Sequence, residues 1–128
     1  EANGDPNKIN FVGELVGDDL ANHYLNSSIF ISTSRTEALP LVLIEAMSFG
    51  LPIISFDHNG AKEILANGKF GKLVPIGDVN GMATAINELA SSPEEMKKLQ
   101  QLSLQRYADF KMPVVIKKWQ DLLDDLIN

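Results

Sequence analysis

The chain has 128 residues, a formal net charge of −6, no cysteine and 45% hydrophobic residues, which suits one globular domain. The missing cysteines exclude disulfides, thiolate metal sites and a thiol nucleophile, and two histidines cannot make a histidine-rich metal site. The eleven lysines and arginines form no basic stripe, so neither nucleic acid nor an anionic membrane surface is an expected partner.

The first half of the chain has the pattern of alternating strands and helices. Residues 9–13 (INFVG) form a short apolar run closed by glycine, which predicts a strand. Residues 18–27 place apolar side chains at helical spacing, and the β-branched run 29–33 predicts a buried strand. A helix is expected over 40–49, because a proline can begin it and the next residue after it is glycine.

The same alternation continues through the middle of the chain. Residues 52–56 (PIISF) predict a strand, 61–66 a short helix closed by Asn-Gly, and 71–75 (GKLVP) the last strand. Strands that alternate with helices of this length indicate a mostly parallel sheet. The predicted fold class is therefore α/β, with a parallel sheet and flanking helices.

Helices alone are expected in the C-terminal part. Apolar residues follow helical spacing over 79–90. A second helix begins where Ser92 can cap it and Glu95 stands three residues later, a capping-box pattern. The last helix, 113–127, carries Trp119 in an apolar stripe, which predicts packing against the core or another domain.

In open α/β sheets, ligands bind beyond the carboxyl ends of the strands. Three segments are expected there: Gly13 and Glu14, residues 34–41, and residues 57–60. The second precedes a helix whose expected cap, Leu39, has no side-chain oxygen for the free N–H groups of the first turn. Uncapped donors at a helix N-terminus suit an anion such as a phosphate.

Two glutamates accompany this helix start. Glu37, in the loop, can accept hydrogen bonds from hydroxyls beside such a phosphate. Glu45 lies among apolar residues of the helix, where a carboxylate is costly unless it finds donors, and a ribose diol offers two. The residues alone leave another interpretation open, in which Glu45 faces solvent on an amphipathic helix. Neither a dinucleotide-binding Gly-x-Gly-x-x-Gly turn nor a P-loop Gly-Lys-Ser/Thr occurs.

The stretch 34–57, SRTEALPLVLIEAMSFGLPIISFD, closely resembles the signature of the retaining, nucleotide-sugar-dependent glycosyltransferases with the two-domain GT-B fold. The resemblance extends to GAKEILANGKFGKLVPIGDVNGMATAI (60–86) and to INFVGELVGDDLANHYLNSSIFISTS (9–34), and so covers most of the chain. It implies a Rossmann-like sheet belonging to a C-terminal GT-B domain.

The resemblance also implies roles for individual residues. Glu37 is similar to the family's first glutamate, which contacts donor-sugar hydroxyls and is the catalytic candidate, and Glu45 to the second, which holds the ribose hydroxyls. The remaining implied donor contacts are backbone groups: Ala38, Leu39 and Leu41 beside the sugar and diphosphate, and Gly13 and Glu14 beside the base. No cofactor is implied, because the nucleotide-diphosphate sugar is a substrate. No metal ion is implied either, because the family pattern lacks a metal-binding carboxylate pair and relies on protein donors.

The sequence departs from the family pattern in two ways. Ala38 stands where the family usually has glycine, and an alanine would be strained if the position needs a positive φ. Family members also have an acceptor-binding domain on the N-terminal side, and two further strands with a basic pair that neutralises the diphosphate. Residues 1–128 are therefore expected to be a single, incomplete nucleotide-sugar-binding domain that is inactive by itself.

The chain is expected to be the donor-binding part of a glycosyltransferase. This enzyme would move a sugar, with retention, from a nucleotide-sugar to a hydroxyl of a saccharide or lipid-linked acceptor. Such a transfer belongs to cell-surface polysaccharide or glycolipid synthesis, in the cytoplasm or at the inner face of the membrane. The alternative is a non-catalytic nucleotide-sugar-binding or assembly module, which would use the same loop.

The missing strands also lead to a topological prediction. The simplest arrangement lays 9–13 directly beside 29–33, which gives a four-stranded parallel sheet. Successive right-handed crossovers then place their helices on one face of the sheet. The opposite face would be covered by the C-terminal helices or by a second copy of the chain in a homodimer.

Overall fold

A three-stranded parallel sheet forms the centre of the computed structural model, which describes residues 5–127. The strands are β1 (Phe30–Ser32), β2 (Ile53–Phe56) and β3 (Lys72–Val74), in the spatial order β1-β2-β3. The register pairs Ile31 with Ile54, and Ile54 with Lys72. Every residue of β2 is buried, as expected for the central strand of a sheet covered on both faces.

The two crossover helices lie on one face of the sheet, as predicted. Helix α2 (Leu41–Ser48) joins β1 to β2, and α3 (Asn59–Ile64) joins β2 to β3. Their apolar residues pack on the Ile53 side of β2, together with Tyr24 of helix α1 (Gly17–Leu25). The buried residues of this cluster are Tyr24, Leu43, Ala46, Met47, Leu51, Ile53, Ala61, Ile64 and Leu65.

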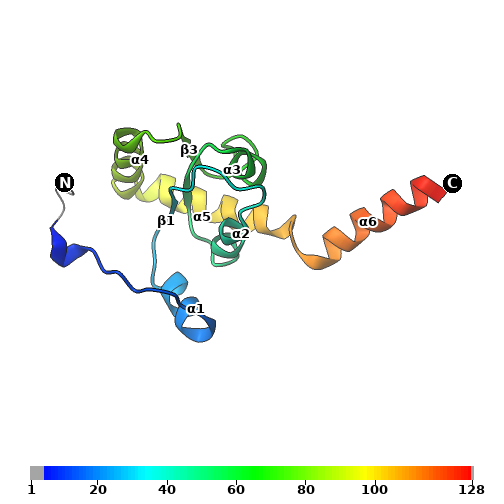
Figure 1. Cartoon of the computed structure of the whole chain (residues 1–128), viewed down its shortest axis with the longest axis horizontal. Helices are drawn as coiled ribbons and strands as arrows, with labels where there is room; N and C mark the ends of the chain where they lie inside the picture. The colour runs from blue at the N-terminus through cyan, green and yellow to red at the C-terminus, as the bar shows by residue number, and fades with distance from the viewer. Residues whose placement is uncertain (1–4, 128) are drawn as a thin grey trace.

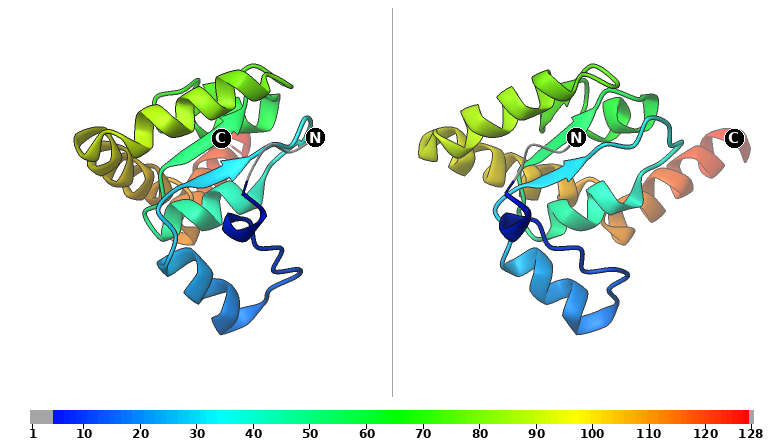
Figure 2. Two further views of the ribbon diagram at one scale, coloured as in Figure 1. Left: turned by 90° about the vertical axis from the view of Figure 1, so that its left-hand side faces the viewer. Right: turned by 60° about the vertical axis from the view of Figure 1, so that its left-hand side comes forward.

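The opposite face is covered by C-terminal helices of the same chain. Helices α4 (Val79–Ala90) and α5 (Pro93–Ala108) form a second core against the other side of β2. Its buried residues are Ile54, Phe56, Val74, Met82, Ala85, Leu89 and Leu99. Figure 2 shows α2 and α4 on opposite sides of the sheet. A second copy of the chain is therefore not needed to cover this face.

Helix α5 also holds the two cores together. It begins as predicted, with the Ser92 hydroxyl accepting a hydrogen bond from the Glu95 amide at 3.2 Å. Further along, the buried Ser103 hydroxyl donates to the Leu51 carbonyl at 2.7 Å. Arg106 donates through Nε to the Ile64 carbonyl at 2.8 Å and through Nη2 to the Glu63 carbonyl at 3.0 Å. These bonds join α5 to the end of α3 and to the start of β2.

The strand predicted over 9–13 is absent, and the sheet of the described residues has three strands rather than four. A short 3₁₀ helix (Pro6–Lys8) is followed by an exposed irregular segment that leads into α1, and Phe11 is 97% exposed. A strand obtains its hydrogen bonds from a neighbouring strand, and no described segment pairs with 9–13. The apolar pattern of 9–13 was therefore insufficient to predict a strand, because it does not show whether a partner strand is present.

The last helix does not pack against the core of this chain, and its packing against another domain stays a prediction. Helix α6 (Met112–Ile127) forms, but it extends away from the rest of the molecule and has no buried residue (Figure 1). Trp119 is 61% exposed because α4 and α5 already occupy the face that the stripe was expected to cover. Within residues 5–127, no helix is long and apolar enough to cross a membrane.

We expect Arg106→Lys to destabilise the chain, because lysine cannot make both carbonyl bonds in the fixed geometry of a guanidinium. Arg106 also stacks over the rings of Phe70 and Phe110, at 5.2 and 4.8 Å from the ring centroids. The expected loss is about 1–3 kcal/mol of unfolding free energy, measured by urea denaturation. The exposed Arg35→Lys is the matched control, and equal midpoints for both variants would contradict the role of Arg106.

Candidate functional site

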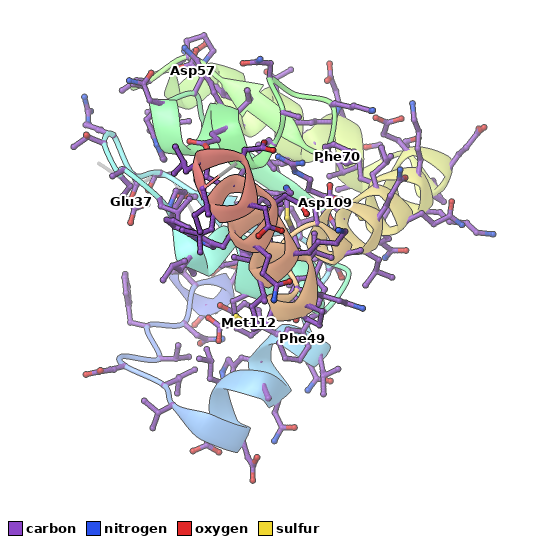
Figure 3. The ribbon with its side chains drawn as sticks, turned by 90° about the vertical axis from the view of Figure 1, so that its right-hand side faces the viewer. Glu37, Phe49, Asp57, Phe70, Asp109 and Met112 are labelled. Carbon is purple, nitrogen blue, oxygen red and sulfur yellow. The ribbon has the colours of Figure 1, made fainter. Side chains whose placement is uncertain are left out.

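The loops that follow the three strands meet at one end of the sheet and enclose a polar pocket of about 420 Å³. Its lining residues are Arg35, Thr36, Glu37, Ala38, Asp57, His58, Asn59, Lys62 and Ile76. Two cationic and two anionic side chains therefore face one space, beyond the carboxyl ends of parallel strands. Figure 3 shows Glu37 on the loop after β1 and Asp57 at the end of β2.

The loop that carries Glu37 lies directly on the first turn of α3. A Cβ added to Gly60 would meet the Glu37 carbonyl oxygen at 2.5 Å, the Ala38 carbonyl oxygen at 3.0 Å and Pro40 Cδ at 2.7 Å. Gly60 is buried, so only a residue without a side chain permits this approach. The sequence signal for this contact is a glycine four residues after β2 ends.

Side chains after β2 fix the other side of the pocket. His58 caps α3, because its Nδ1 accepts a hydrogen bond from the Ala61 amide at 3.3 Å. An imidazole that accepts at Nδ1 carries its proton at Nε2, and this buried atom has no partner among residues 5–127. Asp57 accepts a hydrogen bond from the Ile76 amide at 3.2 Å, which joins the ends of β2 and β3. His58 and Asp57 thus shape the turn that leads from β2 into α3.

Helix α2 starts without a side-chain cap, as the sequence predicted. Its first residue is Leu41 rather than Pro40, which is itself the N-cap, and no side chain accepts a bond from the first turn. Leu39 and Leu41 are exposed beside this helix start. Ala38 is not among the residues with positive φ, so alanine in place of the family's glycine is not strained there. The Leu43 amide donates to the Pro40 carbonyl at 3.0 Å, so the Leu41 and Val42 amides are those available to an anion.

Glu45 lies outside the Glu37 pocket and contacts a residue that the sequence analysis did not connect with it. The Tyr24 hydroxyl, on α1, donates to Glu45 Oε2 at 3.1 Å. Burial of the ring, followed by the hydrogen bond and the charge of Glu45, raises the pKa of Tyr24 to about 12. The sequence places Tyr24 only within the helix predicted over 18–27, because no local pattern links two residues that are 21 positions apart.

The remaining predicted residues, Gly13 and Glu14, belong to neither group. Both are exposed in the irregular segment that precedes α1, and neither lines the Glu37 pocket. Gly13 has φ +70° and open space around it. The structure therefore places Glu37 with Ala38 and Glu45 with Tyr24, while Gly13 and Glu14 stay separate.

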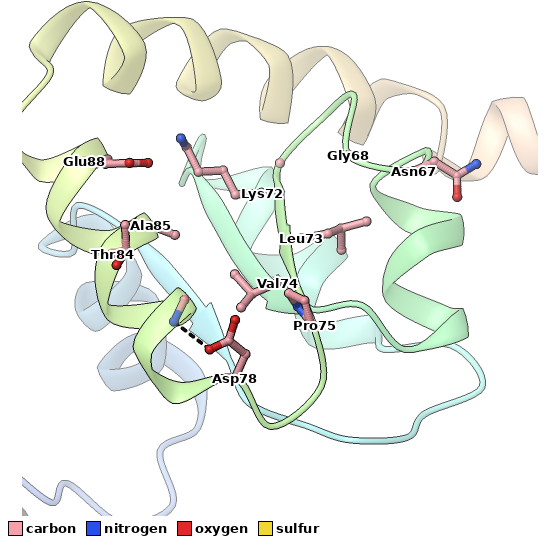
Figure 4. A pocket seen from close by; sticks show the side chains of 12 residues that line it. Asn67, Gly68, Lys72, Leu73, Val74, Pro75, Asp78, Thr84, Ala85 and Glu88 are labelled. Carbon is pink, nitrogen blue, oxygen red and sulfur yellow. Dashed lines mark hydrogen bonds between the residues drawn. The ribbon is translucent and has the colours of Figure 1, made fainter.

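A larger pocket, of about 590 Å³, lies between β3 and α4 and contains none of the predicted site residues (Figure 4). Lys72 and Glu88 extend toward each other across it, and Asp78 caps α4 by accepting a bond from the Gly81 amide at 2.9 Å. Within residues 5–127, no group of three or more histidine, aspartate and glutamate side chains could hold a metal ion.

Comparison with known families identifies the class of protein. The family model described as glycosyl transferases group 1 matches residues 1–106. The chain therefore belongs to the group 1 glycosyltransferases, which confirms the family resemblance drawn from the 34–57 signature.

Curated relatives agree with this assignment. The chain is 32% identical over 116 residues to an uncharacterised glycosyltransferase of Haemophilus influenzae, covering 90% of this chain and 32% of that protein. It is 34% identical over 106 residues to the amylovoran biosynthesis glycosyltransferase AmsD of Erwinia amylovora, covering 82% and 30%. The chain thus spans about a third of the length of these relatives.

A solved structure confirms the fold. Sucrose-phosphate synthase from Thermosynechococcus elongatus superposes with a TM-score of 0.82 at 28% identity, over 95% of this chain and 31% of that one. The predicted α/β class, with a Rossmann-like parallel sheet of the GT-B type, is therefore correct.

The contact at Gly60 generates a prediction about the site. In Gly60→Ala, the new methyl group would displace the Glu37 and Ala38 carbonyl oxygens, so we expect lower stability and a shifted Glu37 loop. The expected cost is about 1–3 kcal/mol, measured by thermal or urea unfolding. The exposed neighbour Asn59→Ala serves as the control. Unfolding of Gly60→Ala at the wild-type midpoint would show that the loop does not rest on α3.

Proposed function

We propose that this chain is the donor-binding part of a glycosyltransferase that moves a sugar from a nucleotide-sugar to an acceptor hydroxyl with retention. The observation that carries the proposal is a polar pocket with Glu37 at the carboxyl ends of the strands, in a chain of the group 1 family. Its volume of about 420 Å³ is within the range typical of small-molecule sites.

Each part of the donor has a proposed partner. Glu37 accepts hydrogen bonds from hydroxyls of the sugar, and Glu45 accepts them from the ribose. The backbone at Ala38, Leu39 and Leu41 faces the sugar and diphosphate, where the uncapped start of α2 favours negative charge. Gly13 and Glu14 lie beside the base, which requires the segment before α1 to approach the site when the donor binds.

The transfer itself needs groups beyond this site. The leaving diphosphate gains negative charge that must be stabilised, and an acceptor hydroxyl must be positioned against the sugar. Arg35 and Lys62 are the cations of the pocket. The acceptor site is proposed to lie in an N-terminal domain, and a dedicated basic pair on two further strands of the donor-binding domain. No metal ion is proposed. The acceptor is proposed to be a saccharide or lipid-linked acceptor in surface polysaccharide synthesis, and the transfer is proposed to take place in the cytoplasm. The name of AmsD, an amylovoran biosynthesis glycosyltransferase, supports a role in biosynthesis.

Two variants separate the proposed roles of the glutamates. We expect Glu45→Ala to weaken binding of both a nucleoside diphosphate and its nucleotide-sugar, because both contain the ribose. Glu37→Ala should weaken only the nucleotide-sugar. Each loss is expected to be about 1–3 kcal/mol, the range for hydrogen bonds to charged groups. Calorimetry with UDP, GDP and ADP and their glucose conjugates measures it.

Glu94→Gln, which changes an exposed glutamate of α5, is the control for the loss of one negative charge. Equal affinities of wild type and Glu45→Ala would contradict the ribose assignment. A loss of UDP, GDP or ADP binding in Glu37→Ala would contradict the sugar assignment. If the wild-type chain binds none of the six compounds, donor binding by this chain is refuted.

A further prediction concerns turnover by the chain. We expect the purified 128-residue chain to bind a donor without transferring sugar to an added saccharide or lipid-linked acceptor, because the acceptor site is proposed to lie elsewhere. Release of nucleoside diphosphate at the rate of a buffer blank is the expected result, with or without manganese. Transfer by the chain alone would refute the separation of the two sites.

A further inference from the structure

The carboxylate of Glu45 is held by a residue of another helix. Glu45 is exposed, and a free glutamate side chain has rotamer entropy that is lost when a ligand fixes the carboxylate. In this structure the Tyr24 hydroxyl donates to its Oε2 at 3.1 Å. One of the two carboxylate oxygens therefore has a fixed position before any ligand binds.

The donor in this hydrogen bond is itself rigid. Only 7% of Tyr24 is exposed, and its ring stacks on Phe49 with a centroid distance of 5.0 Å and an interplanar angle of 15°. Phe30 lies against the same ring at 6.2 Å. Because both aromatic partners belong to the core beside α2, the hydroxyl cannot move without the helix that carries Glu45.

The remaining acceptor capacity of Glu45 suits a vicinal diol. An ionised carboxylate has about four lone-pair directions, and Tyr24 uses one of those on Oε2. Oε1 and the second lone pair of Oε2 stay available, and two neighbouring hydroxyls can donate to them together. Because Tyr24 holds Oε2 in place, a ligand can use both remaining acceptor positions only if it carries two neighbouring hydroxyls.

We propose that Tyr24 is a positioning residue that orients Glu45 and thereby makes the site discriminate ribose from 2′-deoxyribose. This inference rests on the proposed ribose role of Glu45. Removal of the Tyr24 hydroxyl leaves the charge of Glu45 in place but frees its rotamers. In this variant a second ligand hydroxyl adds less to the binding affinity, so the preference for the ribonucleotide over its 2′-deoxy form falls.

The protonation of Tyr24 gives a further expectation. Its pKa is raised to about 12, so the hydroxyl keeps its proton and donates throughout the neutral range. The difference between wild type and Tyr24→Phe is therefore constant from about pH 6 to 9. The contribution of this bond to stability is present below the unfolded pKa near 10 and is lost as the pH rises toward 12.

The experiment compares the affinities of UDP, GDP and ADP with those of their 2′-deoxy forms, by calorimetry on the full chain. The measured ratio is the dissociation constant of the 2′-deoxy form divided by that of the ribonucleotide. In Tyr24→Phe this ratio is expected to fall about twofold to tenfold, the size of the net contribution of one typical hydrogen bond. In Glu45→Ala the ratio approaches one. Tyr107→Phe, which also removes a tyrosine hydroxyl near the same core, keeps the wild-type ratio.

The double variant Tyr24→Phe/Glu45→Ala distinguishes positioning from general loosening of the core. If Tyr24 acts through Glu45, the double variant binds ribonucleotides as Glu45→Ala does. A lower affinity of the double variant than of Glu45→Ala for ribonucleotides overturns the inference. The inference is also overturned if Tyr24→Phe keeps the wild-type ratio of dissociation constants while Glu45→Ala does not. A wild-type ratio in Glu45→Ala instead refutes the ribose role from which the inference starts.

Discussion

Burial of β2 on both faces is the constraint on which the rest of the structure depends. Its adjacent residues Ile53 and Ile54 point to opposite sides, so two separate apolar clusters have to form around one short strand. The crossover helices supply one cluster, and α4 and α5 supply the other. Because both faces of β2 are buried, helices on both sides of the sheet are needed to give the loops at the strand ends fixed positions.

The candidate site is a consequence of that arrangement. Parallel strands end at the same edge, so the loops after β1, β2 and β3 converge without any contact dedicated to catalysis. Their positions are then adjusted by short-range contacts. The Asp57 carboxylate accepts a bond from the loop after β3, and Gly60 lets the backbone at Glu37 rest on α3. The backbone of the three loops thus determines where the pocket lies, and the side chains that line it determine its charge.

Glu45 reaches its position by a different route. It depends on the packing of α1 against the core, because Tyr24 is the only side chain that hydrogen-bonds to its carboxylate among the described residues. The two glutamates of the signature are therefore supported by separate parts of the fold, the first by α3 and the second by α1. A change in one support is expected to leave the other glutamate where it is.

The family, the parallel α/β class and most helices and strands could be predicted from the sequence, because periodicity, caps and the 34–57 signature are local. The sequence also indicated that α2 begins uncapped and that Ser92 caps α5. The folded chain was needed to show that 9–13 is not a strand and that α6 has no buried residue, since both depend on whether a neighbour is present. The same holds for Tyr24 and Gly60: their contacts join residues that are distant in sequence, and no local pattern records such a contact.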